Sequence, residues 1–149
     1  MPEKRTMKRA RRDKRQGKAA STQAGEFVRE EMEHVRRGKH GARSTKQAIA
    51  IGLSKARRSG VRLKPPKRGQ SSARTRKSAA RAYRAGQHGR RRPSSTRSRG
   101  VRRALKREGH RAASRRSLSR QARSSARRRG HRAMSKQARK AARTRARAA

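Results

Sequence analysis

The feature that most constrains this chain is the density of cations in its second half. Residues 70–149 hold 29 Lys and Arg residues against a single acid, Glu108. Charges this dense repel one another in any compact state. A segment poor in large apolar side chains also buries too little surface to offset the entropy of ordering its backbone. We therefore expect this half to be disordered alone, or to become helical only when bound phosphates neutralise it.

Charge and proline placement divide the chain into three parts. The whole chain carries a net charge of +44, yet six of its seven acids lie before residue 34. The pair Pro65-Pro66 stops a helix and favours extended backbone. We expect a basic arm over residues 1–20, a helical hairpin domain over 21–64 and a basic Arg/Ala/Ser-rich tail over 65–149. The predicted fold is all-α: a small two-helix hairpin with long disordered or conditionally helical extensions.

Apolar spacing predicts the first helix of the hairpin over about residues 22–37. Val28, Met32 and Val35 recur at i, i+4 and i+7, and Phe27 widens the stripe that they form. Such a stripe is typical of a helix that buries one face.

The second helix is predicted over residues 44–57, STKQAIAIGLSKAR. Ser44 and Gln47 form an S-x-x-Q capping box, which satisfies free amides at a helix start. The predicted hairpin core consists of Phe27, Val28, Met32, Val35, Ile49, Leu53 and Ala56. A core of this size is near the lower limit for independent folding, so a homodimer through the hairpin stays open as an alternative.

Catalytic and metal-binding patterns are missing from the sequence. The absence of cysteine excludes disulfides and thiolate zinc sites. His34 and His40 lack further ligands at metal spacing, and the glutamates of the first helix are better explained by ion pairing. There is no P-loop and no nucleophile placed beside a base. We expect no enzyme activity, no cofactor, no metal and no small-molecule substrate.

Membrane association is not expected either. The first residues are charged throughout and lack the apolar core of a secretory signal. No apolar run approaches the roughly 20 residues that cross a bilayer. The expected location is the cytoplasm, at the nucleoid.

The arginines of the tail predict a nucleic-acid partner. Lys and Arg displace condensed counterions from phosphates, and this term does not depend on base sequence. Duplex DNA is the expected partner and RNA the alternative, because a chain almost free of aromatics lacks stacking platforms for single strands. The candidate phosphate-binding residues are Arg90, Arg91, Arg92, Arg102, Arg103, Arg115, Arg116, Arg127, Arg128, Arg129, Arg139, Lys140 and Arg143.

Two motifs that would recognise particular DNA remain open as alternatives. Residues 89–93, GRRRP, have some likeness to an AT-hook, although Arg91 stands where the hook has glycine. The two helices are also compatible with a helix-turn-helix, although their linker of about six residues exceeds the usual three or four.

Two stretches resemble a known family. Residues 25–32, GEFVREEM, and 38–57, GKHGARSTKQAIAIGLSKAR, are similar to a domain of small, uncharacterised, basic bacterial proteins that are labelled DNA-binding or of unknown function. The tail resembles theirs in ALKRE (104–108), LSRQAR (118–123) and RKAARTR (139–145). The resemblance implies a histone-like role inside a bacterial cell and brings no catalytic residues.

The sequence therefore predicts a protein that neutralises and compacts DNA without reading its sequence. Two alternatives are an RNA- or ribosome-associated basic protein and an adaptor whose hairpin binds a protein partner.

Overall fold

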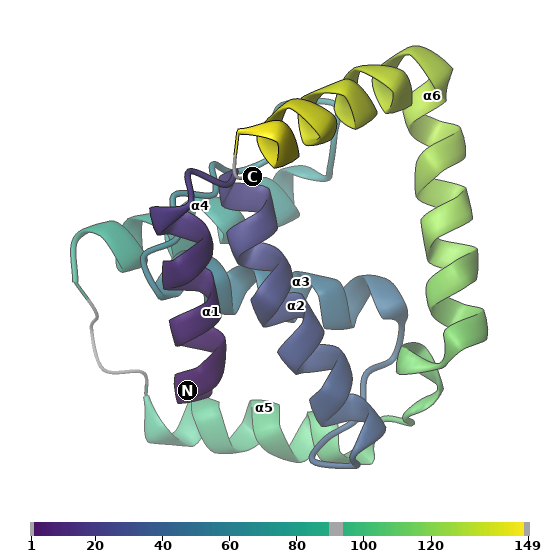
Figure 1. Cartoon of the computed structure of the whole chain (residues 1–149). Helices are drawn as coiled ribbons and strands as arrows, with labels where there is room; N and C mark the ends of the chain where they lie inside the picture. The colour runs from purple at the N-terminus through teal and green to yellow at the C-terminus, as the bar shows by residue number, and fades with distance from the viewer. Residues whose placement is uncertain (1, 90–93, 148–149) are drawn as a thin grey trace.

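Helices follow one another along almost the whole chain (Figure 1). The structure, a computed structural model, describes residues 2–89 and 94–147, of which 75% are helical and none forms a strand. The elements are α1 (Lys4–Arg15), α2 (Ala20–Arg36), α3 (Thr45–Arg58), α4 (Ala73–Gln87), α5 (Ser95–Arg107), the short 3-10 helix η1 (Arg111–Ala113) and α6 (Arg115–Ala146).

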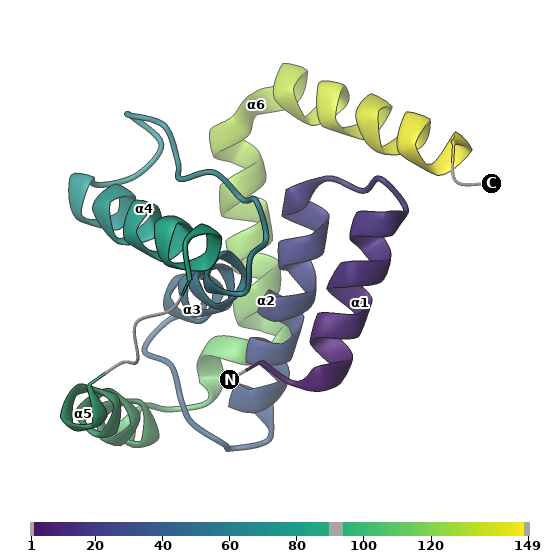
Figure 2. The ribbon, with the colours of Figure 1, turned by 90° about the vertical axis from the view of Figure 1, so that its left-hand side faces the viewer.

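The two predicted helices are present as α2 and α3, but the predicted fold is wrong in both its parts: the two helices cross instead of forming a hairpin (Figures 1 and 2), and the extensions are neither disordered nor conditionally helical. The basic arm contains α1, and the tail contains α4, α5 and α6. The tail is rich in alanine and arginine, which are strong helix formers. The expectation of disorder rested on net charge and on the scarcity of large apolar side chains, and it gave too little weight to local helix signals.

Serine caps supply one of those local signals. The side chains of Ser72, Ser94 and Ser114 accept hydrogen bonds from backbone amides three residues on, at the starts of α4, α5 and α6. The same interaction starts α3, where Ser44 accepts from the amide of Gln47 at 3.2 Å and confirms the predicted cap. A serine cap is worth about 1 kcal/mol, so each one favours a helix at a defined residue.

Helices α2 and α3 cross with their backbones in contact. Gly52 of α3 is buried, and a Cβ atom placed on it would lie 2.7 Å from Cα of Val28 and 3.0 Å from the carbonyl oxygen of Phe27. Real Cβ contacts are longer than this, so only glycine allows the two helices to approach so closely.

The apolar core extends beyond α2 and α3. Phe27, Val35 and Ala56 are fully buried and Met32 is nearly so, while Val28, Ile49 and Leu53 are partly buried against them. Other elements contribute Ala10 of α1, Ala112 and Ala113 of η1, and Leu118 of α6. The apolar faces of α2 and α3 therefore pack against segments from both ends of the chain.

Helix α4 docks on α3 through small residues. Ala79 and Ala82 are buried. A Cβ atom on Gly86 would lie 1.8 Å from the carbonyl oxygen of Arg57, so the C-terminal parts of the two helices touch backbone to backbone. Alanine and glycine thus make a helix contact without any large apolar side chain.

A backbone connection, which we call the loop clamp, joins the α2–α3 loop to the segment between α5 and α6. The amide of Gly41 donates to the carbonyl of Leu105 at 2.8 Å, and the amide of Ala42 donates to the carbonyl of Gly109 at 3.0 Å. The hydroxyl of Thr45, which is buried, donates to the carbonyl of Ala112 at 2.6 Å. The clamp holds the end of α5 and the connection to α6 against the α2–α3 loop and the start of α3.

Helix α6 bends at Gly130, where φ is 73° and ψ is 163°. This backbone conformation is essentially restricted to glycine. We call residues 115–129 the first arm and residues 131–146 the second arm; each is roughly 22–24 Å long at 1.5 Å per residue. We call α1, α2 and α3 together the bundle. The first arm of α6 runs beside the bundle, and the second arm returns across one end of it (Figures 1 and 2).

Candidate nucleic-acid interface

The acids of this protein gather in the bundle and are matched there by cations. Each of the six acids before residue 34 lies within ion-pair distance of at least one Lys, Arg or His. Their closest recorded partners are His34 for Glu3, Lys18 for Asp13, Arg9 for Glu26, Lys55 for Glu30 and Glu31, and Arg5 for Glu33.

Glu3 shows how strongly this matching acts at the start of α1. Its Oε1 lies 2.9 Å from Nε2 of His34 and 3.1 Å from Nζ of Lys39. The hydrogen bonds from His34 and then Lys39 lower the pKa of the Glu3 carboxyl from 4.5 to about 2. The carboxylate therefore stays charged at any ordinary pH and links α1 to the end of α2.

Two buried glutamates share one lysine. Glu30 and Glu31 are almost completely buried on α2, and Nζ of Lys55 lies 3.8 Å from Oε1 of Glu30 and bonds directly to Oε2 of Glu31. Buried charges are tolerated only when they are paired and hydrogen-bonded. Lys55 therefore secures α3 against α2 by charge as well as by packing.

The helices after residue 70 carry cations without matching acids. Five Lys and Arg residues lie on α4, six on α5 and thirteen on α6, and the only acid nearby is Glu108. Within the described part of the chain, no ion pair involves α4, α5 or α6. Their positive charge faces solvent uncompensated.

Ten of the predicted phosphate-binding residues lie in the described structure, and all ten are exposed. They are Arg102 and Arg103 on α5, Arg115, Arg116, Arg127, Arg128 and Arg129 on the first arm of α6, and Arg139, Lys140 and Arg143 on the second arm. Arg90, Arg91 and Arg92, with the AT-hook-like sequence that contains them, lie outside the described residues.

The exposed cations form stripes along α6. On the second arm, Arg132, Lys136, Arg139 and Arg143 recur at i, i+4, i+7 and i+11, which places them on one helix face. The first arm repeats this spacing with Arg116, Arg120, Arg123 and Arg127.

The structure does not join all the predicted residues into one patch. Helix α5 lies along one end of the bundle and the second arm of α6 lies along the opposite end (Figures 1 and 2). The first arm runs between them. The exposed cations therefore lie on three helical segments around the bundle, which are α5 and the two arms of α6 and which we call the frame. The molecule presents positive charge on more than one side.

Apart from Leu118 near its start, which packs partly buried against the core, helix α6 has no apolar face. The structure describes every residue of it, and none is buried. A helix without an apolar face gains little from packing on its own protein. Its side chains are therefore available to another surface.

Helix α3 is poorly placed to read bases as a helix-turn-helix would. It packs against α2 on one side and α4 on another, and Gly52, Ala48 and Ala56 are buried in those contacts. A recognition helix must enter the major groove with one face free. The apolar residues Val28, Ile49 and Leu53, through which a second copy was expected to bind, are partly covered here by residues of α1, η1 and α6.

One cluster was missed by sequence reasoning. Glu31, His34 and His40 place one ligand atom each within 4.8 Å of one another. Glu31 and His34 are three residues apart on α2 and so share a helix face, a signal that the sequence does contain. His40 reaches them from the loop after Gly38, and only the folded chain reveals that third contribution.

Comparison of this chain with models of protein families, with curated proteins and with solved structures finds no match. None of the helices that the structure describes combines the length and the apolar character needed to cross a lipid bilayer.

Proposed function

We propose that this protein binds duplex nucleic acid without reading its base sequence, and that its partner in the cell is DNA. The observation that carries the proposal is the separation of charge within one molecule. The acids are paired with cations inside the bundle, and the cations of α5 and α6 are exposed and unmatched. A surface of that kind releases counterions from a phosphate lattice when it binds.

The shape of α6 favours duplex DNA over duplex RNA. A helix with side chains is roughly 10–12 Å wide, and the major groove of B-DNA is roughly 12 Å wide. The corresponding groove of A-form RNA is narrow and deep, so side chains cannot enter it. Each arm is roughly 22–24 Å long and can follow the phosphates of several base pairs.

Sequence discrimination is not supported by this surface. Base readout needs side chains held rigidly against a groove. The arginines of α6 are exposed, and the hydrogen bonds that they make are to nearby α6 residues, as from Arg129 to Gln137 at 2.9 Å. Flexible exposed arginines can follow phosphates of any sequence.

The positions of α5 and of the second arm of α6 would allow the protein to compact DNA. Helix α5 and the second arm of α6 lie at opposite ends of the bundle, so one molecule can contact two duplex segments (Figure 1). Bridging of this kind draws DNA together without any change in the protein.

The test is the salt dependence of binding to two unrelated 30-base-pair DNA duplexes and to RNA duplexes of the same sequences. We expect the two DNA affinities to agree and to fall by several decades between roughly 50 and 500 mM salt, as counterion release requires. DNA should bind more tightly than RNA at each salt concentration. Salt-independent affinity, or strong preference for one DNA sequence, would overturn the proposal; preference for RNA would assign the same surface to the alternative partner.

A further inference from the structure

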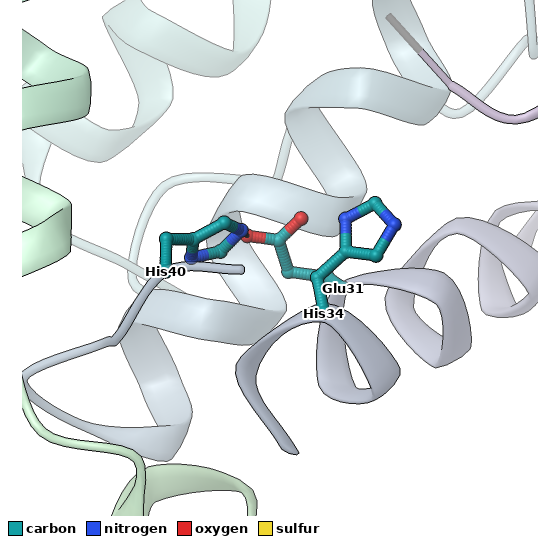
Figure 3. Close-up of side chains that lie close together, drawn as sticks. All are labelled: Glu31, His34 and His40. Atoms are coloured by element: carbon teal, nitrogen blue, oxygen red, sulfur yellow. Dashed lines mark ion pairs between the residues drawn. The ribbon is translucent and has the colours of Figure 1, made fainter. Parts of the chain in front are cut away.

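Glu31, His34 and His40 converge at the end of α2 (Figure 3). Glu31 is fully buried, and the side chains of His34 and His40 are only 12% and 16% exposed. The two imidazole rings are perpendicular, with centroids 6.0 Å apart, and the Glu31 carboxylate lies between them (Figure 3). None of these residues belongs to the cationic surface proposed to bind DNA.

Both histidines are oriented by a second acceptor. Nδ1 of His40 lies 3.1 Å from the carbonyl oxygen of Gly41, and Nε2 of His34 lies 2.9 Å from Oε1 of Glu3. Each acceptor holds a proton on the nitrogen beside it. The other nitrogen of each neutral ring is then a lone pair available to the cluster. Metal-binding histidines show this same arrangement, in which a carbonyl or carboxylate accepts from the far nitrogen.

The carboxylate at the centre has an unused oxygen. Oε2 of Glu31 bonds to Nζ of Lys55, but Oε1 has no hydrogen-bond partner among the residues that the structure describes. It lies 3.3 Å from Nε2 of His40. With His40 neutral and Nδ1 carrying the proton, two lone pairs face each other across that distance. A metal cation between the two atoms would satisfy both lone pairs, as would a proton on Nε2 that makes His40 the cation of an ion pair with Glu31.

We propose that Glu31, His34 and His40 bind one divalent transition-metal ion, and that Zn²⁺ is the best match. Two ligands at roughly 2.0–2.1 Å from a tetrahedral zinc ion lie roughly 3.3 Å apart, which is the separation of Oε1 of Glu31 and Nε2 of His40. The third ligand atom, from His34, lies within 4.8 Å of the others, so its side chain would have to move closer to complete the set. Two imidazoles and one carboxylate leave the fourth position to water.

The ion would act on the fold next to the loop clamp. Glu31 and His34 lie on α2, whereas His40 lies one residue before Gly41, whose amide bonds to Leu105. Binding would hold the α2–α3 loop against α2 and thereby steady the attachment of α5. Lys55 competes for the same carboxylate, but its side chain is 26% exposed and can remain on Oε2.

The first test uses the full chain without a polyhistidine tag, freed of nucleic acid and stripped with a chelator. Zn²⁺ is added in competition with a chromophoric chelator, and one equivalent should bind per chain at micromolar concentration. The NMR signals of two of the five histidines should move while the other three stay in place. Failure to bind one equivalent, or movement of a different set of histidines, would overturn the proposal.

Variants identify the ligands. We expect His40→Ala and His34→Ala each to weaken zinc binding by at least tenfold, and Glu3→Gln to weaken it by roughly 10–100-fold through the orientation of His34. His88→Ala and His131→Ala, which remove exposed histidines elsewhere, are the matched controls and should bind as the natural chain does. Stoichiometric zinc that survives both His34→Ala and His40→Ala would place the ion elsewhere and overturn the assignment.

Discussion

The bundle of α1, α2 and α3 and the long helix α6 are both basic and both helical, but different forces maintain them. The bundle buries Phe27 and Val35 and pairs its cations with six acids. Helix α6 packs Leu118 against the core but has no fully buried residue, contains no acid and starts from the cap of Ser114. Net charge therefore does not decide where this chain folds. The placement of a few acids decides which cations are used internally and which remain for a partner.

The two regions should consequently respond to different perturbations. The bundle depends on packing and buried ion pairs, which act within the chain. The arms of α6 depend on helix propensity and a cap, and their mutual repulsion is relieved by external anions. Charge changes on α6 should alter binding with little effect on stability, and packing changes in the bundle should do the reverse.

The largest effect is expected when the first arm loses its charge cluster. Replacing Arg127, Arg128 and Arg129 with Gln removes three exposed cations. If each contacts a phosphate, the slope of log affinity against log salt falls by roughly 2.7, and affinity near 100 mM salt falls by roughly 10²–10³-fold. Fluorescence anisotropy with a labelled duplex measures both, and the thermal midpoint without DNA should stay the same.

The matched control removes the same charge from α1. Lys8, Arg11 and Arg12 are exposed and make no ion pair in the described structure, and we expect their replacement with Gln to cost less than a tenth as much affinity. Equal losses of DNA affinity in the α1 and α6 variants would contradict the distinction between the bundle and α6, because binding would then depend on total charge and not on α6.

A smaller effect, on stability, is expected from glycine substitutions in the two regions. Gly52→Ala forces a Cβ atom to within 2.7 Å of Val28 in the bundle and should destabilise the fold by roughly 1–3 kcal/mol. Gly100→Ala on α5 meets no described atom within 4 Å and should stabilise that helix by roughly 0.5–1 kcal/mol. Urea unfolding followed by circular dichroism measures both, and a stable Gly52→Ala variant would contradict the backbone contact of α2 and α3.

Helices α2 and α3 were predictable because their signals are local. The stripe of Val28, Met32 and Val35 repeats along one helix, and the Ser44 cap lies within four residues. The rest of the fold depends on contacts that small residues make with residues far away in the sequence. Ala112 completes the core and Gly86 touches α3, yet neither alanine nor glycine carries a periodic signature.

The sequence allowed us to predict that the candidate site consists of exposed arginines, but not how these arginines are arranged in space. Exposure of the arginines follows from their number, because too few acids exist to pair with them. That six of the seven acids would be paired inside the bundle, and that α5 and α6 would lie around it, depends on tertiary contacts such as Lys55 with Glu31. The approach of His40 to Glu31 has the same origin.

The smallest effect is expected at the surface of the bundle, and it depends on pH. The pKa of Glu3 is lowered from 4.5 to about 2, so its ionised form stabilises the fold fully above about pH 4.5 and loses that effect as the pH falls toward 2. The difference in urea midpoint between the natural chain and Glu3→Gln should therefore shrink over that range, with a chelator present throughout. Glu108→Gln, at a carboxylate with no ion pair among the described residues, is the control, and an unchanging difference for Glu3→Gln would contradict the lowered pKa.

The loop clamp has a consequence for the synthesis of this chain. Thr45 bonds to Ala112, so α3 leaves the ribosome long before its partner carbonyl exists. At roughly 5–20 residues per second, the interval lasts roughly 3–14 s. During that time the surface later covered by Ala112, Ala113 and Leu118 stays open on a nascent polycation surrounded by ribosomal RNA. A fragment that stops before residue 105 would remain in that open state permanently, and the complete bundle requires part of the tail that follows it.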